Sequence, residues 1–345
     1  MNSELISVVV PCYNEEEVLP LFYDEITRVS AEMQKEHSHL EFEFLFVNDG
    51  SKDGTLKVLR QLALKDERVR YVSFSRNFGK EAGLFAGLEN VKGDYVVTLD
   101  ADLQHPPKLI PQMYEYVSSG EYHCAGTRRI SRKGEPALLS FFSGSFYKVI
   151  NSISQTHIVE GAQDFRFMTR QMVDAILEMP EYNRFSKGIF SWVGFETKYI
   201  EVENTERAAG KSTFNFWKLF KYSLEGICAF STAPLAFSFV LAPLMCIAAV
   251  VMYVIAIVCA VTGVGGGTAA IIGTVLVTGG LILLCTGING MYLSKTYMES
   301  KARPKYVAAE TEKTYKKSDI SVFNETLNYY QNNESKSSSI EKLDI

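Results

Sequence analysis

Two aspartates separated by one residue, Asp100 and Asp102, follow an apolar run that ends at Leu99. Because alternate residues of an extended chain point to the same side, the two carboxylates can face one ligand together. Paired carboxylates suit a hard divalent cation such as Mg²⁺ or Mn²⁺, which bridges diphosphate oxygens and neutralises charge on a leaving nucleotide. The spacing alone is more typical of a strand-end turn that carries two solvated acids, but its position after an apolar strand, with two other acid-ended strands nearby, favours the metal site.

Acidic residues also follow two other apolar runs. Glu15 comes after the run 6–10, and Asp49 comes after the run 42–47. Asp49 lies between turn-forming residues, so it can recognise the base or ribose of a nucleotide, or it can cap a loop that leads into a helix. Glu15 can equally be an acid in the first turn of a helix, where the helix dipole favours it.

Two cations, Arg76 and Lys80, follow a further apolar run at 69–74. Cationic side chains at the end of a strand can hold the phosphates of a nucleotide. The alternative is an ordinary solvated face of the following helix.

These residues depend on short apolar runs that alternate with helical patterns. Such alternation predicts a Rossmann-like α/β domain, in which a mostly parallel sheet has helices on both faces. Ligands bind beyond the carboxyl ends of such strands, where the acids and cations lie. No G-x-G-x-x-G follows the first strand, which weakens a dehydrogenase interpretation. We expect strands at 6–10, 42–47, 69–74 and 95–99, with helices at 18–36 and 55–64.

A segment of 69 residues, Gly226–Ser294, contains no Asp, Glu, Lys, Arg or His. A membrane-spanning helix needs roughly 20 apolar residues, so the segment predicts two transmembrane helices, near 235–261 and 269–294. The alternative is a very apolar hairpin in a soluble core. Lysines and arginines flank both ends and are absent from the connecting loop, which places both termini in the cytoplasm.

Composition divides the rest of the chain. Residues 1–210 are mixed and globular, whereas 303–345 are polar and are predicted to be a disordered tail. Residues 137–153 and 211–232 have apolar positions at helical spacing, which predicts amphipathic helices at the membrane interface, or ordinary packing against the core. The formal net charge of -5 gives no bias toward nucleic acid. The first residues lack a basic leader and a cleavage site, so the globular part is expected in the cytoplasm.

Four ordered motifs resemble the family 2 glycosyltransferases: PCYNE at 11–15, NDGSKDGT at 48–55, SRNFGKEAG at 75–83 and DADLQHPP at 100–107. More narrowly, they resemble the polyprenyl-phosphate glycosyltransferases, the group of dolichol-phosphate mannose synthase and the bactoprenol glucosyltransferases. The resemblance extends from Ile6 to about Leu293. It implies a GT-A fold, inversion at the sugar carbon and a homo-oligomer, as tetramers occur in the family.

The resemblance also implies roles for single residues. The nucleotide pocket would be lined by Pro11, Tyr13, Glu15 and Asp49, and the metal and diphosphate would be surrounded by Asp100, Asp102 and Gln104. Asp164 and Asp102 would be the catalytic residues. Acceptor phosphate would meet Arg128 and Arg166, with Arg207 and Lys211 beside the first span as phosphate ligands or headgroup anchors. The chain departs from the family at Asn48, where many members carry an acid.

Asp164 need not be a strong base. A phosphate monoester has a second pKa of about 6, so a lipid phosphate is largely dianionic at neutral pH and its oxygen can attack the sugar directly. We therefore expect Asp164 to orient acceptor or sugar; the alternative is a buried salt bridge with Arg166.

The expected activity is transfer of one sugar, from UDP-glucose or UDP-N-acetylglucosamine, to undecaprenyl phosphate at the cytoplasmic membrane face, with Mg²⁺ or Mn²⁺. The product would be a lipid-linked donor for cell-envelope glycosylation. One alternative is a processive polysaccharide synthase, although no Q-x-x-R-W occurs and two spans are too few for a conduit. Another is a non-catalytic membrane partner that only binds nucleotide sugar.

Overall fold

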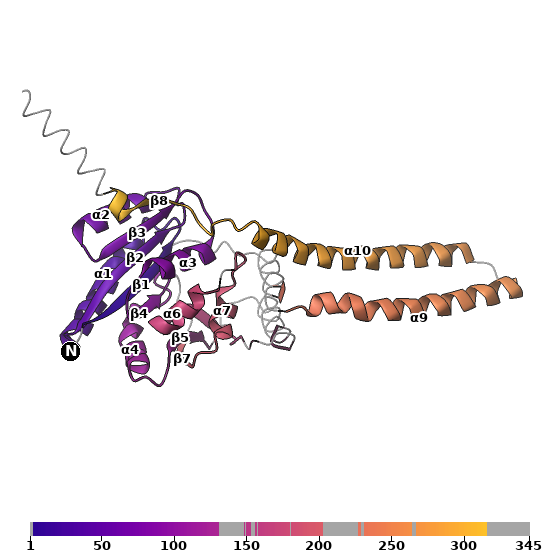
Figure 1. Ribbon diagram of the computed structural model, residues 1–345, viewed down its shortest axis with the longest axis horizontal. Coiled ribbons are helices and arrows are strands. Elements are labelled where there is room, and N and C mark those ends of the chain that lie inside the picture. The colour runs from indigo at the N-terminus through magenta and orange to yellow at the C-terminus, as the bar shows by residue number, and fades with distance from the viewer. Residues whose placement is uncertain are drawn as a thin grey trace, which may run out of the picture.

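The computed structural model describes residues 3–130, 148, 150–152, 156, 158–179, 181–202, 227–228, 231–263 and 267–315. These residues form an α/β domain from which two long helices project side by side (Figure 1).

The α/β domain is built on one eight-stranded sheet. Its strands are β1 (Glu4–Cys12), β2 (Leu40–Asn48), β3 (Val69–Phe74), β4 (Tyr95–Thr98), β5 (Cys124–Arg129), β6 (Ala162–Thr169), β7 (Thr197–Val202) and β8 (Ala308–Thr311). They lie in the order β7-β5-β6-β4-β1-β2-β3-β8. The four central strands, β3-β2-β1-β4, are parallel, whereas β6 and β8 pair antiparallel with β4 and β3. The four strands expected from the sequence are confirmed.

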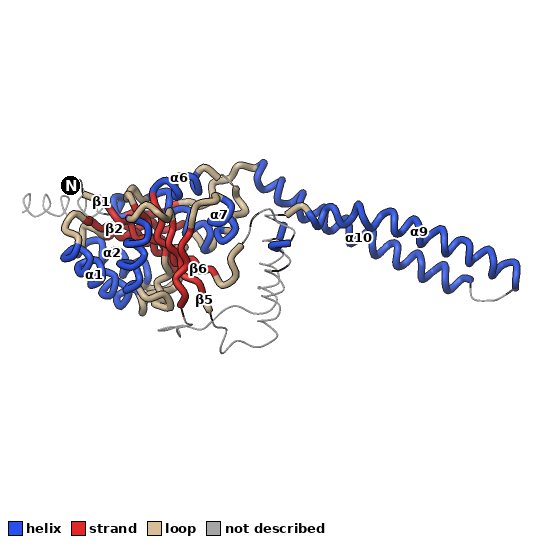
Figure 2. Tube along the Cα trace, turned by 90° about the horizontal axis from the view of Figure 1, so that it is seen from below, coloured by secondary structure: helices blue, strands red, loops and turns tan. Residues whose placement is uncertain are grey.

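Helices cover both faces of the sheet, as Figure 2 shows. Val9 of β1 packs with the helices of one face, whereas its neighbours Val8 and Val10 pack with those of the other. Burial on both faces explains why β1 is a continuous apolar run without alternation. The first face carries α3 (Lys80–Asn90), α6 (Arg170–Leu177) and α7 (Ser186–Trp192), and the second carries α1 (Leu19–Glu36), α2 (Thr55–Lys65) and α4 (Ile110–Ser118).

The two projecting helices are α9 (Ala233–Thr262) and α10 (Gly267–Ser300), and both are long and apolar enough to cross a membrane. They include the predicted spans. Their apolar side chains are exposed rather than buried inside the described structure, which argues against the alternative of a soluble core hairpin. At their base, the Tyr292 hydroxyl donates to the Ser231 carbonyl oxygen at 2.6 Å.

The prediction of a disordered tail from residue 303 is wrong for its first part. Residues 308–311 form β8, which pairs with the edge strand β3. The guanidinium of Arg60 donates twice to the Glu310 carboxylate, at 2.8 and 2.5 Å, and the Tyr71 hydroxyl donates to it at 2.6 Å. These ion-pair and ladder contacts order a segment whose polar composition indicated disorder. Residues 316–345 lie outside the described residues.

Glu310→Ala should lower the free energy of unfolding by about 1–3 kcal/mol, because it removes charge-assisted hydrogen bonds from two partners. Denaturant unfolding of the full chain in detergent measures this change, and limited proteolysis reports release of the segment after Ser300. Lys313→Ala, at an exposed neighbouring position, is the control. Equal stability of both variants would show that β8 is held by backbone pairing alone.

The predicted interfacial helices at 137–153 and 211–232 fall mostly outside the described residues, as do Arg207 and Lys211. Interfacial binding by these helices, and phosphate or headgroup contact by these two cations, stay predictions.

Candidate active site

The carboxyl ends of the parallel strands meet at one edge of the sheet. Cys12 pairs with Asn48, Asn48 pairs with Ser73, and Val9 of β1 pairs with Thr98 of β4. The residues that follow β1, β2, β3 and β4 therefore come together, as expected from the sequence.

The loops after β1 and β2 are joined by hydrogen bonds. The Asn14 N–H donates to the Ser51 hydroxyl oxygen at 2.9 Å, and the Asn14 side-chain oxygen accepts the Lys52 N–H at 2.9 Å. Asn14 has φ 57°, in the left-handed region that asparagine tolerates better than most residues. These hydrogen bonds fix the loop that starts at Pro11. Tyr13 lies in this loop at the sheet edge and is 43% exposed.

Asp49 is buried at the same edge, and its carboxylate is used by the chain itself. It accepts the N–H groups of Phe78 at 2.6 Å and Gly79 at 2.9 Å, immediately before α3. Burial raises the pKa of Asp49 above its ordinary value, although both hydrogen bonds act in the opposite direction. Asp49 therefore caps a loop that leads into a helix, which is one of the two roles that the sequence allowed. The other role, contact with a base or ribose, is a proposal. The Glu15 N–H donates to the Thr55 hydroxyl at 2.9 Å, which joins the loop after β1 to the start of α2.

Gly50 has φ +63°, and a Cβ there would lie 2.3 Å from the carbonyl carbon of Arg76. Only glycine fits this close approach of two loops. The Arg76 side chain is exposed, and its guanidinium lies 4.2 Å from the centre of the Phe78 ring.

Gly50→Ala should therefore separate the two loops, lower stability by about 2 kcal/mol or more and weaken binding of the nucleotide expected at this edge. Gly120→Ala is a matched control, because Gly120 also has positive φ but has no atoms near its missing Cβ. Unfolding and nucleotide titration of both variants measure the difference. An unchanged nucleotide affinity in a folded Gly50→Ala protein would show that this turn has no part in nucleotide binding.

Lys80 links the two acidic elements of the site. Its Nζ lies 2.9 Å from Asp100 Oδ2 and 2.8 Å from Asp164 Oδ2. Asp164 reaches this position because β6 runs antiparallel beside β4, where the Thr98 hydroxyl donates to the Asp164 carbonyl oxygen at 2.6 Å. Lys80 was predicted to hold phosphate, and the structure places it between two carboxylates.

The opposite charges in this cluster shift the pKa values of Asp164 and Lys80 in opposite directions. Burial would raise the pKa of Asp164, but Lys80 above all, with Lys187 and Arg166, lowers it well below its usual range. Burial would lower the pKa of Lys80, but Asp164 and Asp100 outweigh it and raise that pKa. Asp164 is therefore ionised at neutral pH, and its lowered pKa makes it a weak base, which favours orientation of a reactant over proton abstraction.

Asp102 and Gln104 lie in the turn after β4. Leu103 has φ 58°, and this turn directs the Gln104 N–H onto Asp102 Oδ1 at 3.1 Å. Among the described residues, no three His, Cys, Asp or Glu side chains form a metal-binding group. The fit to a cation rests on Asp100 and Asp102. Two carboxylates match Mg²⁺ or Mn²⁺ that takes its other ligands from a diphosphate and water, the usual arrangement for nucleotide sites.

Two residues of the site, His105 and Glu81, were not predicted from the sequence. His105 is buried, which lowers its pKa against the raising influence of Asp100 and Asp102. Glu81, next to Lys80, accepts the N–H of Ser186 at 3.0 Å and also its hydroxyl. His105 lies within the DADLQHPP motif, which could have indicated its place; the link from Glu81 to α7 had no local signal.

The two predicted acceptor-side arginines that the structure describes differ in exposure. Arg128 is exposed and its Nε donates to the Glu160 carbonyl oxygen at 3.1 Å. Arg166 is 1% exposed, with its guanidinium 4.5 Å from the centre of the Phe190 ring. The ion pair that the structure gives Asp164 is with Lys80, so Arg166 acts on Asp164 through its charge.

The chain has a mostly parallel sheet with acids and a lysine at its carboxyl edge, and with the family match below this fold is GT-A. The family model described as glycosyl transferase family 2 matches residues 7–177. The chain belongs to glycosyltransferase family 2, and it is a glycosyltransferase.

Its relatives match over almost the whole chain. A putative glycosyltransferase of Bacillus subtilis is 38% identical over 312 residues, which cover 90% of this chain and 93% of the relative. A prophage bactoprenol glucosyl transferase homolog of Escherichia coli is 39% identical, with 89% and 99% covered. The bactoprenol glucosyl transferase of Shigella phage SfX is 40% identical, with 88% and 98% covered.

Solved structures are more distant. Glucosyl-3-phosphoglycerate synthase from Mycobacterium tuberculosis, in complex with Mn²⁺, uridine-diphosphate-glucose and phosphoglyceric acid, is 17% identical. The match covers 65% of this chain and 78% of that chain, with a TM-score of 0.41.

Proposed function

We propose that the enzyme transfers a single sugar from UDP-glucose or UDP-N-acetylglucosamine to undecaprenyl phosphate or a related polyprenyl phosphate. The observation that carries this proposal is the union, in one chain, of the Asp100–Lys80–Asp164 cluster with two exposed apolar helices. A nucleotide-sugar site explains the first feature, and an acceptor held in a bilayer explains the second. The names of the bactoprenol relatives, which match across both regions, support the same acceptor.

In the proposed reaction, an oxygen of the lipid phosphate attacks the anomeric carbon and the bond to the diphosphate breaks. One displacement inverts that carbon, and UDP leaves with the electron pair of the broken bond. Asp100, Asp102 and Gln104 would hold Mg²⁺ or Mn²⁺, which neutralises charge on the diphosphate when bound. No base is needed, because the lipid phosphate is already largely dianionic above pH of about 6.

The chain's own residues position the reactants. Tyr13, exposed at the sheet edge, can stack on the base. Lys80 keeps Asp164 ionised and fixed, so its carboxylate can orient a sugar hydroxyl at the point of attack. Arg128, exposed on β5, is available for the acceptor phosphate.

The proposed topology places α9 and α10 across the plasma membrane, with the α/β domain and both termini in the cytoplasm. The cation-free connection between the helices and the cations that follow Ser294 support this orientation. The exposed apolar faces of α9 and α10 also suit packing against further copies of the chain, and we propose a homo-oligomer.

The test uses purified full-length protein with undecaprenyl phosphate, Mg²⁺ or Mn²⁺ and each of several radiolabelled nucleotide sugars, with and without EDTA. Label extracted into organic solvent from one donor, and its loss with EDTA, is the expected result. Label in a growing polymer would assign a processive synthase instead. Folded protein that gives no lipid-borne label from any donor would overturn the proposed acceptor.

A further inference from the structure

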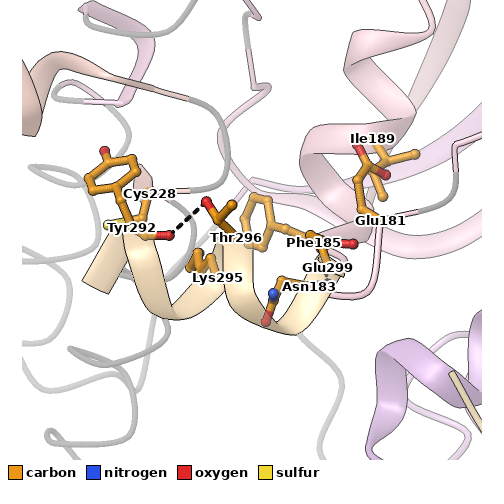
Figure 3. A pocket seen from close by; sticks show the side chains of 9 residues that line it. All are labelled: Glu181, Asn183, Phe185, Ile189, Cys228, Tyr292, Lys295, Thr296 and Glu299. Atoms are coloured by element: carbon orange, nitrogen blue, oxygen red, sulfur yellow. Dashed lines mark hydrogen bonds between the residues drawn. The ribbon is translucent and has the colours of Figure 1, made fainter. Parts of the chain in front are cut away.

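A cavity of about 300 Å³ lies where α10 meets the α/β domain, and none of its lining residues belongs to the Asp100–Lys80–Asp164 cluster (Figure 3). Among the described residues, three segments line it: the base of α10, residues 181–189 of α7 and the loop before it, and Cys228. The junction is tied together by Glu299, whose carboxylate accepts the N–H groups of Tyr182 at 2.9 Å and Asn183 at 3.2 Å.

Two polar atoms of the cavity wall lack partners within the described part of the chain. They are Glu181 Oε2, a carboxylate oxygen, and Asn183 Nδ2, an amide donor, and both atoms are buried. The Arg184 cation interacts with Glu181 through its charge but gives this oxygen no hydrogen bond. A buried carboxylate oxygen without a hydrogen-bond donor is costly, so it indicates an occupant that donates one. The rest of the lining is mixed: Phe185, Ile189 and Tyr292 supply apolar surface, and Lys295 supplies a cation.

The position of the cavity indicates which occupant to expect. Lys295 is the first charged residue after the 69-residue run without charge, so the cavity lies at the end of the apolar part of α10. In the proposed membrane topology, on which this inference rests, that level is the headgroup region of the cytoplasmic leaflet. A phosphate monoester alone would bring its negative charge against Glu181. A headgroup with both an ammonium and a phosphate complements Glu181 with the first group and Asn183 and Lys295 with the second.

We propose that this junction cavity binds the headgroup of an aminophospholipid such as phosphatidylethanolamine. The ammonium donates to Glu181, and the phosphate accepts from Asn183 with Lys295 nearby. The primary ammonium supplies the N–H donors that a choline headgroup lacks.

Occupancy of the cavity is connected to the active site through α7. Phe185 and Ile189 line the cavity, and Ser186 between them is held by Glu81, the neighbour of Lys80. A bound headgroup would therefore steady the helix that borders the catalytic cluster, and it should raise the transfer rate as well as the stability.

Native mass spectrometry of the full chain, titrated with phosphatidylethanolamine, phosphatidylglycerol or phosphatidylcholine, tests the proposal. We expect phosphatidylethanolamine to be retained most tightly, and Glu181→Gln to weaken it roughly tenfold, as loss of a charged hydrogen bond predicts. Asn183→Leu is a second variant that removes the donor and keeps the backbone contact to Glu299. Glu178→Gln, at an exposed site three residues away, is the matched control and should bind as the unaltered chain does.

Equal retention of the three lipids, or no effect of Glu181→Gln, would show that Glu181 selects no headgroup and would overturn the proposal. Displacement of phosphatidylethanolamine by undecaprenyl phosphate would assign the cavity to the acceptor instead. Soluble phosphoethanolamine retained as tightly as the lipid would assign it to a free ligand. The proposed reaction is tested separately, by transfer assays on the same preparations. The headgroup preference is measured without a sugar donor, so failure of one proposal can be told from failure of the other.

Discussion

Asp102→Asn should lower kcat/KM for sugar transfer by about 10³-fold while the protein stays folded, a loss typical of removing one group that stabilises developing charge. Asparagine keeps the shape of the side chain and can still accept the Gln104 N–H at Oδ1, so the turn after β4 is preserved. It removes the negative charge that pairs with Asp100 to hold a divalent cation.

The measurement is transfer of radiolabel to undecaprenyl phosphate, joined by calorimetric titration of UDP with and without Mn²⁺. In the variant, the metal-dependent part of UDP binding should disappear and the metal-independent part should remain. Asp24→Asn, on the exposed face of α1, is the control for loss of one carboxylate. Full activity of Asp102→Asn, with metal-dependent UDP binding unchanged, would remove this residue from catalysis and from the metal site.

Asp164→Asn should reduce transfer by about 10²-fold or more at every pH from 6 to 8, because misplacement of a reacting group by a small distance costs this much. The shape of the pH profile should not change. The pKa of Asp164 is lowered by Lys80, so its carboxylate is ionised across this range and contributes no limb to the profile. The fall in rate below pH of about 6 should come from protonation of the acceptor phosphate.

This pH profile tests for a general base whose pKa lies near the working pH. If Asp164 were such a base, its replacement would remove an acidic limb of kcat/KM that the unaltered enzyme shows. The control is Asp174→Asn, which removes an exposed carboxylate paired with Arg170 on α6. Asp174 lies outside the active-site cluster, so its replacement should leave the transfer rate unchanged, whereas replacement of Asp164 should lower it.

The sheet was predictable because its central strands are buried on both faces. The runs 6–10, 42–47 and 69–74 are largely apolar, without the helical spacing that a helix on a soluble surface shows. Parallel strands then place their following residues at one edge, which is why the sequence alone was enough to group Glu15, Asp49 and Asp100.

Contacts made by distant segments were not predictable. Lys80 and Asp164 are 84 positions apart and meet only because β6 inserts antiparallel beside β4. The segment 308–311 has little apolar character, and its order depends on Arg60 and Tyr71 far back in the chain. Asp49 could serve a nucleotide or a loop, and only the path of the backbone at Phe78 and Gly79 shows the second use.

The position of β8 has a consequence for how the protein is made. Strands β1 to β7 leave the ribosome before α9 and α10, but the strand that covers the edge of β3 emerges after both helices. During synthesis the α/β domain therefore carries an open strand edge, which can pair wrongly with another chain. In the proposed topology, β8 covers that edge only after the helices have entered the bilayer. Completion of the catalytic sheet therefore follows membrane insertion during biogenesis.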